Sequence, residues 1–302
     1  MATEVRENIE DSARQVRSQI RFVDPGKFIT RRYVSQGKEM NTGTYSDHEV
    51  IVRDGMPIRD HFTLDTHGFM IGKNPSAVTD FHDKAQVDAL YKREVEEHIR
   101  QLTGADKCFA RGWMIRTSAD LSQRAQEKVA GYQHTGGIQP PAGEAHVDID
   151  PATAQRMAEM TYREKCPDGP GFKRFLITSY WRTFSPPPQD VPLAVADGRT
   201  SFGGEEKSNT MYIVDEFPSE EEAIAPIEGE EERMAATIFS FNPGMRWWYF
   251  SNMQADDVLF FKFHDSDHSV TWRCPHTAFR DPSFPDANIR ESIECRSVAF
   301  WE

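Results

Sequence analysis

The chain has 302 residues and a formal net charge of −13, with 35 Lys and Arg residues against 48 Asp and Glu residues. This balance argues against a nucleic-acid partner, because binding to a phosphate backbone depends on concentrated positive charge. No stretch approaches the roughly 18 consecutive apolar residues that a membrane helix needs, so no membrane partner is expected.

The four cysteines lie far apart in the chain and form no Cys-x-x-Cys pair. Neither a zinc ribbon nor a disulfide framework is therefore indicated, and the thiols are expected to be reduced. Reduced thiols and the lack of an apolar segment at the N-terminus favour a cytoplasmic protein. Barrels and sandwiches with additional elements reach this length as one unit, so residues 1–302 are expected to form a single domain.

The first third of the chain contains short strands and one long helix. Residues 1–20 are polar and charged, which predicts an arm or a short helix. Within residues 21–105, short apolar runs broken by Gly and Pro predict strands and turns. A helix follows from Asp83 to about Thr103, with Asp83 at its N-cap, Gly104 at its C-cap and an apolar stripe between them. We expect this helix to be a scaffold, because such a stripe is typical of core packing.

Residues 106–302 are expected to form the core of the domain, since they contain many short strand-like segments and few helices. Asp150-Pro151 predicts the start of a helix that runs to about Lys165. An acidic insertion at about 215–233 could be a lid or a solvated connection between strands, and the second interpretation is favoured. The whole pattern predicts a mainly β fold with flanking helices, either a sandwich or a barrel.

His146-Val147-Asp148 is the first candidate for a metal site. In a strand, residues two apart face the same way, so His146 and Asp148 could offer neighbouring ligands to one ion. A non-haem Fe(II) oxygenase site needs a second histidine and leaves the other positions open for cosubstrate and O2. Three later histidines are candidates for that ligand: His264, His268 and His276. His276 is preferred because its apolar surroundings would hold the imidazole still.

Arg290 and Ser292 follow His276 in the last strand-like segment. An arginine with a hydroxyl two positions further along a strand can bind a carboxylate through charge-assisted hydrogen bonds. The order of the pieces carries the information: His-x-Asp, a long intervening segment, a histidine near the C-terminus, and then Arg-x-Ser.

This order resembles the Fe(II)/2-oxoglutarate-dependent dioxygenase superfamily, and more narrowly the fungal hydroxylase/desaturase group called AsaB-like, CmcJ-like or gibberellin-desaturase-like. The resemblance extends from about residue 60 to the C-terminus. The matching pieces are His67-Gly68-Phe69, Leu102-Thr103-Gly104-Ala105, Arg116, His146-Val147-Asp148, Trp181-Arg182, Pro192-Leu193-Ala194 with Asp197, Trp247-Trp248-Tyr249-Phe250, Lys262 with Asp265-Ser266, His276-Thr277-Ala278-Phe279 with Asp281-Pro282, and Arg290-Glu291-Ser292-Ile293-Glu294 with Arg296.

The resemblance implies a double-stranded β-helix, the cupin-like jelly roll, in a single oxygenase domain. It implies that His146, Asp148 and His276 hold Fe(II), with 2-oxoglutarate and O2 as cosubstrates. Arg290, helped by Ser292, would bind the distal carboxylate of 2-oxoglutarate. Arg296, on the same face of the strand, is the alternative residue for that role.

The implied reaction is oxidation of an unactivated C–H bond of a small molecule in fungal secondary metabolism, by hydroxylation, desaturation or ring closure. Arg116, Trp181 and Arg182 are expected to line the substrate pocket. A second arginine in the pocket would suit a carboxylate-bearing substrate, such as an amino acid or its derivative. The sequence predicts no oligomeric state.

Two other functions are compatible with the same residues. One is a cupin-type metalloenzyme, an oxygenase or isomerase, that does not use 2-oxoglutarate. The other is a non-catalytic jelly-roll binding protein, although an intact set of metal ligands argues against it. A hydrolase is less favoured, because neither Gly-x-Ser-x-Gly nor His-Glu-x-x-His occurs.

Overall fold

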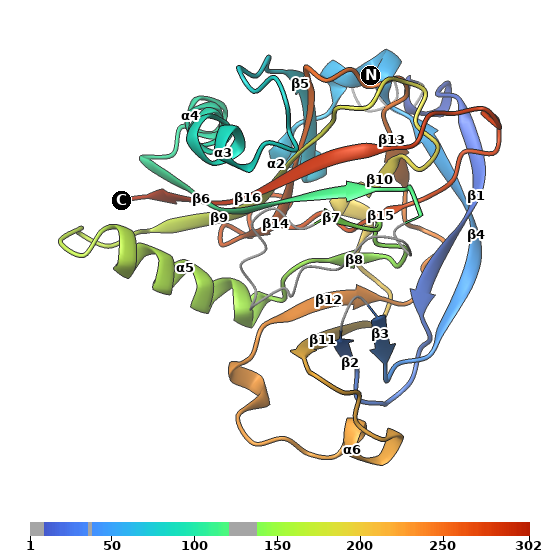
Figure 1. The fold of residues 1–302 in the computed structure, drawn as a ribbon, viewed down its shortest axis with the longest axis vertical. Coiled ribbons are helices and arrows are strands. Elements are labelled where there is room, and N and C mark those ends of the chain that lie inside the picture. Colours follow the sequence, from blue (N-terminus) through green and yellow to red (C-terminus); the bar gives the residue numbers. More distant parts are fainter. Residues whose placement is uncertain (1–8, 36–37, 121–137) are drawn as a thin grey trace.

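The computed structural model describes residues 9–35, 38–120 and 138–302, and within them two β-sheets dominate (Figure 1). The larger sheet contains, in spatial order, β1 (Gln15–Val23), β4 (Tyr45–Asp54), β13 (Trp247–Tyr249), β10 (Leu193–Ala196), β15 (His276–Ala278), β8 (His146–Val147), β12 (Ala235–Phe239), β11 (Glu206–Ile213), β2 (Arg31–Ser35) and β3 (Lys38–Asn41). The smaller sheet contains β5 (Phe69–Lys73), β14 (Asp257–Asp265), β9 (Arg174–Thr183), β16 (Glu291–Trp301), β6 (Lys107–Thr117) and β7 (Ile138–Gln139). The prediction of a mainly β jelly-roll core is confirmed.

Helices flank the two sheets, as predicted. They are α2 (Leu64–His67), α3 (Lys84–Gln86), a π-helical turn (Val87–Tyr91), α4 (Lys92–Thr103), α5 (Pro151–Lys165) and α6 (Glu220–Ile224), with short 3₁₀ turns at Met56–His61, Gly198–Thr200 and Glu230–Glu232. In Figure 1, α3 and α4 lie on one side of the strands β6, β9 and β16, and α5 lies on the other side. No helix among the described residues is both long enough and apolar enough to cross a membrane.

The predicted helix boundaries agree with the capping contacts. The Asp83 carboxylate accepts hydrogen bonds from the backbone N–H groups of Ala85 and Gln86, and Gly104 ends α4 at a φ of 69°. The Asp150 carboxylate likewise accepts from the N–H of Thr153 at the start of α5. Both N-caps satisfy N–H groups that have no partner within the helix, which is why the acidic residues mark these positions.

The two faces of the smaller sheet belong to two different apolar clusters. In β9, Phe175, Ile177 and Trp181 face the cluster between the sheets, whereas Leu176 and Tyr180 face the cluster beneath α4. This alternation follows from the period of two in a strand. Every functional side chain of the smaller sheet must therefore lie on the Trp181 face if it is to reach the space between the sheets.

The arm was expected at residues 1–20, of which residues 1–8 lie outside the described residues. Residues 15–20 belong to β1, which pairs with β4 in the antiparallel direction. Val16, Ile20 and Phe22 are buried at alternate positions of this strand. Burial of that apolar face holds the segment in the sheet, so the prediction of an arm is wrong for these residues.

The acidic segment 215–233 connects β11 to β12 and contains α6 (Figure 1). Its anchor is an ion pair between the Arg31 guanidinium, which is 1% exposed, and the Glu230 carboxylate at 2.5 Å. Arg31 also donates hydrogen bonds to the carbonyl oxygens of Ala223 and Ala225. These contacts tie the segment to β2, as expected for a connection between strands.

Candidate functional site

The predicted metal ligands converge between the two sheets. His146 in β8 lies directly opposite His276 in β15, and the centroids of their rings are 4.4 Å apart. Asp148 follows β8, and its Oδ1 lies 3.1 Å from Nε2 of His146. One ligand atom from each of the three residues lies within 4.8 Å of the other two. Two ligands at about 2.1 Å from one ion and at right angles would be roughly 3 Å apart, so the donor set fits a single metal.

Backbone carbonyls hold both imidazoles in the orientation that a metal ligand needs. Nδ1 of His146 lies 2.7 Å from the carbonyl oxygen of Glu144, and Nδ1 of His276 lies 3.2 Å from that of Cys274. Because a carbonyl oxygen only accepts, each Nδ1 carries a proton and donates it. The Nε2 atoms are therefore directed into the space between the sheets, as in metal-bound histidines.

The charges around the three residues favour a cation. Burial, followed by the charge of His146, lowers the pKa of His276 to about 3, so this imidazole is neutral. Burial opposes the charge of Asp148, but Arg296 and His146 outweigh it and hold the pKa of this carboxyl well below its usual range. Burial also opposes protonation of His146, yet the hydrogen bond to Asp148 raises its pKa. A metal ion would displace that proton.

Arg290 provides a buried positive charge at the same space. It is 1% exposed and immediately precedes β16 in the smaller sheet. Its Nη1 donates to the carbonyl oxygen of Val191 at 2.8 Å, whereas its Nε has no hydrogen-bond partner in the described part of the chain. Burial, and then the charge of Arg116, lower the pKa of Arg290 to about 9. A buried guanidinium with a free N–H is suited to a carboxylate ligand.

A pocket joins the histidines to Arg290. Its lining residues are Arg116, Ala142, His146, Trp181, Leu193, Phe261, His276, Thr277, Ala278, Arg290 and Glu294. Among them, His276 comes from the larger sheet, Glu294 comes from β16 of the smaller sheet, and Arg290 immediately precedes β16. The aromatic and aliphatic residues cover the walls between these polar groups, which is typical of small-molecule sites.

A β-bulge brings Arg116 to this pocket. Along β6, Ala110 pairs with Ser297 and Gly112 pairs with Arg296, so Arg111 has no residue opposite it in β16. The extra residue reverses which positions of β6 face inward. Arg116 therefore lies on the pocket side, where its Nη1 donates to the carbonyl oxygen of Pro140 at 2.8 Å.

Of the three predicted substrate residues, Arg116 and Trp181 line the pocket and Arg182 does not. Arg182 is the neighbour of Trp181 in β9 and points to the opposite face of the sheet. There its guanidinium bonds the hydroxyl of Tyr91 at 3.1 Å and the carbonyl oxygen of Ala255 at 3.1 Å. The prediction that Arg182 lines the pocket is therefore wrong, because neighbouring residues in a strand point to opposite faces of the sheet.

The other two residues predicted to bind 2-oxoglutarate do not line the pocket. Ser292 is buried, and its hydroxyl donates to the carbonyl oxygen of Arg116 at 3.4 Å. Arg296 is absent from the pocket lining, and its Nη2 binds Oδ2 of Asp148 at 2.6 Å. These positions favour Arg290 over Arg296 for 2-oxoglutarate, and the role of Arg296 stays a prediction. His264 packs edge-on against Trp272 and His268 stacks on it, and neither belongs to the group formed by His146, Asp148 and His276.

Several lining residues were not singled out from the sequence. Glu294 lies two strand positions beyond Ser292, so the alternation that linked Arg290 to Ser292 could have identified it. Phe261 packs beside His276, with ring centroids 4.8 Å apart. It lies in an apolar strand whose local sequence does not distinguish a pocket wall from core packing.

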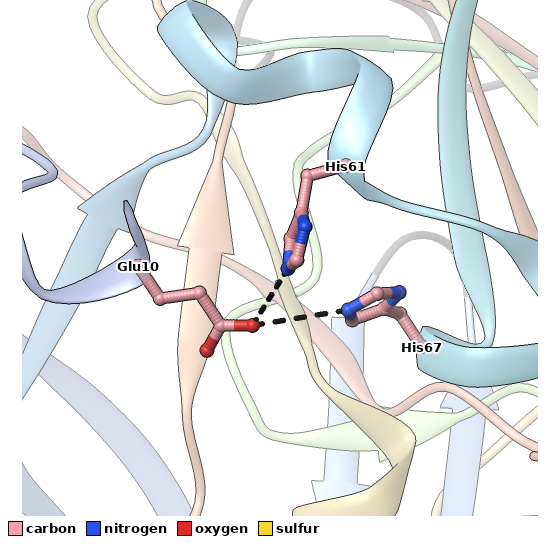
Figure 2. A group of neighbouring side chains, drawn as sticks. All are labelled: Glu10, His61 and His67. Carbon is pink, nitrogen blue, oxygen red and sulfur yellow. Dashed lines mark hydrogen bonds and ion pairs between the residues drawn. The ribbon is translucent and has the colours of Figure 1, made fainter. Parts of the chain in front are cut away.

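A second group of potential ligands lies outside this pocket. Figure 2 shows Glu10, His61 and His67, whose ligand atoms also lie within 4.8 Å of one another. Oε1 of Glu10 is 2.9 Å from Nε2 of His61 and 3.9 Å from Nε2 of His67. The backbone N–H of Thr63 donates to Nδ1 of His67, so neutral His67 carries its proton on Nε2, the atom that a metal would need.

Positive charges already balance Glu10. Nη1 of Arg246 lies 3.0 Å from Oε2 of Glu10, and Nη2 of Arg199 lies 3.5 Å from Oε1. Burial opposes the charge of Glu10, but His61 and the two arginines outweigh it and lower its pKa. This cluster is therefore an anchor for the segment before β1, and the added charge of a metal ion is unfavourable there.

Known proteins resemble the chain over most of its length. A family model described as "Oxidoreductase/YMDC permease-like domain" matches residues 20–300. The chain is 30% identical over 274 residues to the Fe(II)/2-oxoglutarate-dependent dioxygenase nvfI of Aspergillus novofumigatus, and the matched region covers 87% of each protein. It is 30% identical over 261 residues to the hydroxylase/desaturase CTB9 of Cercospora beticola, which covers 85% of this chain and 78% of that protein.

A solved structure agrees with these relatives. The iron and alpha-ketoglutarate-dependent endoperoxidase NvfI superposes with a TM-score of 0.73 and 26% identity, covering 95% of this chain and 98% of the other. The sequence-based recognition of the superfamily is thereby confirmed. The chain belongs to the Oxidoreductase/YMDC permease-like domain family and is an Fe(II)/2-oxoglutarate-dependent dioxygenase that oxidises a small molecule.

Proposed function

We propose that His146, Asp148 and His276 are the three protein ligands of Fe(II) in this enzyme. The observation that carries the proposal is that one ligand atom each of His146 in β8, of Asp148 just after it and of His276 in β15 lie within 4.8 Å of one another. Two histidines and one carboxylate are the usual set for non-haem Fe(II) oxygenases, and they leave positions open for cosubstrate and O2.

The ligand proposal can be tested by metal analysis of purified variants. His276→Ala is expected to lose stoichiometric Fe(II), because two ligands remain. His264→Ala is the matched control, since His264 is also a buried strand histidine with a pKa lowered by burial, to about 4, but it lies outside the pocket. Loss of iron in the control and retention in His276→Ala would contradict the assignment.

Arg290 is the residue proposed to bind the distal carboxylate of 2-oxoglutarate. Its support is the free Nε–H on a guanidinium that is 1% exposed in the pocket. Arg116 is more exposed and already donates to Pro140, so it is less suited to this role. When bound together, Fe(II), 2-oxoglutarate and O2 supply an oxidant that can remove hydrogen from an unactivated C–H bond.

The protein's own contribution is position and the exclusion of water. Trp181 lies beside Arg290, with 5.8 Å between the guanidinium carbon and the centroid of an indole ring, and Phe261 covers His276. These apolar walls lower the local dielectric constant and strengthen the pairing of Arg290 with a carboxylate. The position of the substrate relative to the histidines then decides between hydroxylation, desaturation and ring closure.

For the substrate, we propose a small molecule with a carboxylate, such as an amino acid or its derivative, that pairs with Arg116. Two arginines face the pocket, and 2-oxoglutarate requires one of them. Burial lowers the pKa of Arg116, although the charges of Glu294 and Asp148 oppose this shift, so an additional anionic ligand would stabilise the charged form. The four free cysteines among the described residues suit the proposed cytoplasmic location.

Arg116→Ala tests the substrate class. A panel of small carboxylates can be screened for compounds that stimulate 2-oxoglutarate turnover in the wild type. Arg116→Ala is expected to raise the KM for the active compound while leaving the 2-oxoglutarate KM unchanged. Arg182→Ala is the control because Arg182 faces away from the pocket. Equal effects of both substitutions, or stimulation only by uncharged compounds, would contradict the proposal.

A further inference from the structure

We propose that Arg296 is a positioning residue that reserves one oxygen of Asp148 for the metal by binding the other oxygen. The inference rests on the proposed ligand set and adds a role for a residue outside the pocket lining. Asp148 has two carboxylate oxygens, and both could in principle coordinate one ion. The structure assigns them to different partners.

The two oxygens of Asp148 are clearly separated. Oδ1 lies 3.1 Å from Nε2 of His146, on the side where the ligand atoms converge. Oδ2 accepts a hydrogen bond from Nη2 of Arg296 at 2.6 Å. A charge-assisted bond of this length is among the stronger hydrogen bonds in proteins. A metal beside the two histidines therefore meets Oδ1, and Oδ2 is engaged elsewhere.

Arg296 is itself held in place by three features. Its Nε donates to Oε1 of Glu294 at 2.8 Å, so two different nitrogens bind two different carboxylates. Its guanidinium carbon lies 5.8 Å from the ring centroid of Phe263, and that ring stacks on His276 with planes 17° apart. The β6 bulge lies directly opposite Arg296, and bulges beside functional sites commonly redirect a side chain.

This arrangement matters because of the number of positions around the ion. With Fe(II) bound, two imidazoles and one carboxylate oxygen would occupy three of six positions and would leave two for the keto acid and one for O2. If Asp148 used both oxygens, it would occupy a fourth position and compete with the cosubstrate. Arg296 thus protects the binding of 2-oxoglutarate without touching it.

The test compares two arginines of similar surroundings. Arg296→Met removes the guanidinium that binds Oδ2 of Asp148 and keeps an unbranched side chain. Arg174→Met is the matched control, because Arg174 also makes a 2.6 Å pair with an aspartate, Asp265, and is 27% exposed, against 23% for Arg296. Each variant is saturated with Fe(II) without oxygen and titrated with 2-oxoglutarate, while the visible charge-transfer band is recorded.

Arg296→Met is expected to need about 10–100-fold more 2-oxoglutarate than the wild type, the range typical of changes to residues that orient metal ligands. The band is also expected to shift, which a loss of fold stability alone would not produce. Arg296→Lys, which keeps one donor and the charge, is expected to restore part of the affinity, and Arg174→Met is expected to match the wild type.

A wild-type titration and band in Arg296→Met would overturn the proposal. If that variant does not fold, Arg296→Gln takes its place, because glutamine is too short to reach Asp148 and predicts the same outcome. Failure of this inference is distinguishable from failure of the proposed ligand set. The ligand set fails if His276→Ala retains the wild-type band, whereas this inference fails if the band depends on His276 but not on Arg296.

Discussion

Arg290→Met should make the protein without metal or cosubstrate more stable. Arg290 is a buried guanidinium whose pKa falls from 12.5 to about 9, and burial is the largest cause. This change corresponds to a penalty of roughly 5 kcal/mol on the charged form at neutral pH. The substitution also removes the hydrogen bond to Val191, at a cost of up to about 3 kcal/mol for a charged donor. A net gain of about 2 kcal/mol in unfolding free energy is expected.

Urea unfolding at pH 7 measures this gain as a higher midpoint with an unchanged slope. The penalty on Arg290 applies fully below pH 9 and declines as the pH rises above it, because the folded form then loses its proton first. Arg182→Met is the control with the opposite sign. Its guanidinium donates hydrogen bonds to the Tyr91 hydroxyl and the Ala255 carbonyl oxygen and lies over the Tyr91 ring, so its removal should destabilise the fold.

The same variant should lose the stabilisation that the cosubstrate provides. Fe(II) with 2-oxoglutarate at 100 times its Kd should raise the unfolding free energy of the wild type by about 2.7 kcal/mol relative to Fe(II) alone. Arg290→Met should gain far less at that concentration. A variant that is less stable than the wild type and still gains the full amount would refute the role of Arg290.

Three further predictions concern the Glu10 cluster, the acidic segment 215–233 and the wall of the pocket. The Glu10→Gln variant should be less stable than the wild type at pH 7, because the lowered pKa of Glu10 means that folding favours its charged form. Thermal unfolding should show this difference in stability vanish as the pH falls below the pKa of Glu10 in the folded protein. Arg31→Met should lower the unfolding free energy by about 2 kcal/mol, less than for a fully buried pair because Glu230 is 23% exposed, and should leave the 2-oxoglutarate Kd unchanged. A changed Kd would indicate that segment 215–233 reaches the pocket. Trp181→Ala should raise the 2-oxoglutarate Kd by exposing Arg290 to water, whereas an equal Kd in isothermal titration would contradict the role of the pocket wall.

Local patterns were sufficient for the parts of the fold that depend on neighbouring residues. Asp83, Gly104 and Asp150 act at the helix ends where the sequence places them, because a cap involves residues at most a few positions apart. The approach of His146 to Asp148 is also local. The pairing of His146 with His276 across two strands is not, and its prediction depended on the ordered resemblance to a family.

Register explains most of what the sequence did not predict. Trp181 and Arg182 are neighbours in a strand, so only one of them could line the pocket. Arg182 is buried against Tyr91 on the opposite face of the sheet, which leaves Trp181 on the pocket side. The bulge at Arg111 changes the inward-facing positions of β6, and no local pattern marks it. The pair of Arg296 with Asp148 joins residues 148 positions apart, which a pattern of neighbours cannot reveal.

The prediction of an arm failed at residues 15–20 because the alternation of buried and exposed residues there was not recognised as that of a strand. Val16, Ile20 and Phe22 are buried on one side of β1, and Ser18 between them shares that side. The charged residues at alternate positions gave the segment a polar composition, which predicts an arm. The alternation itself is typical of a strand with one face exposed to water.

We propose that His276 holds Fe(II) and that Arg290 binds 2-oxoglutarate in the same pocket. The most direct measurement is an anaerobic titration of the metal-free protein with Fe(II) and then 2-oxoglutarate, recording the weak visible charge-transfer band of the chelated keto acid. We expect a band in the wild type, no band in His276→Ala, and a band in Arg290→Ala only at a far higher concentration of 2-oxoglutarate. A band that survives His276→Ala, or one that forms equally well in Arg290→Ala, would contradict it.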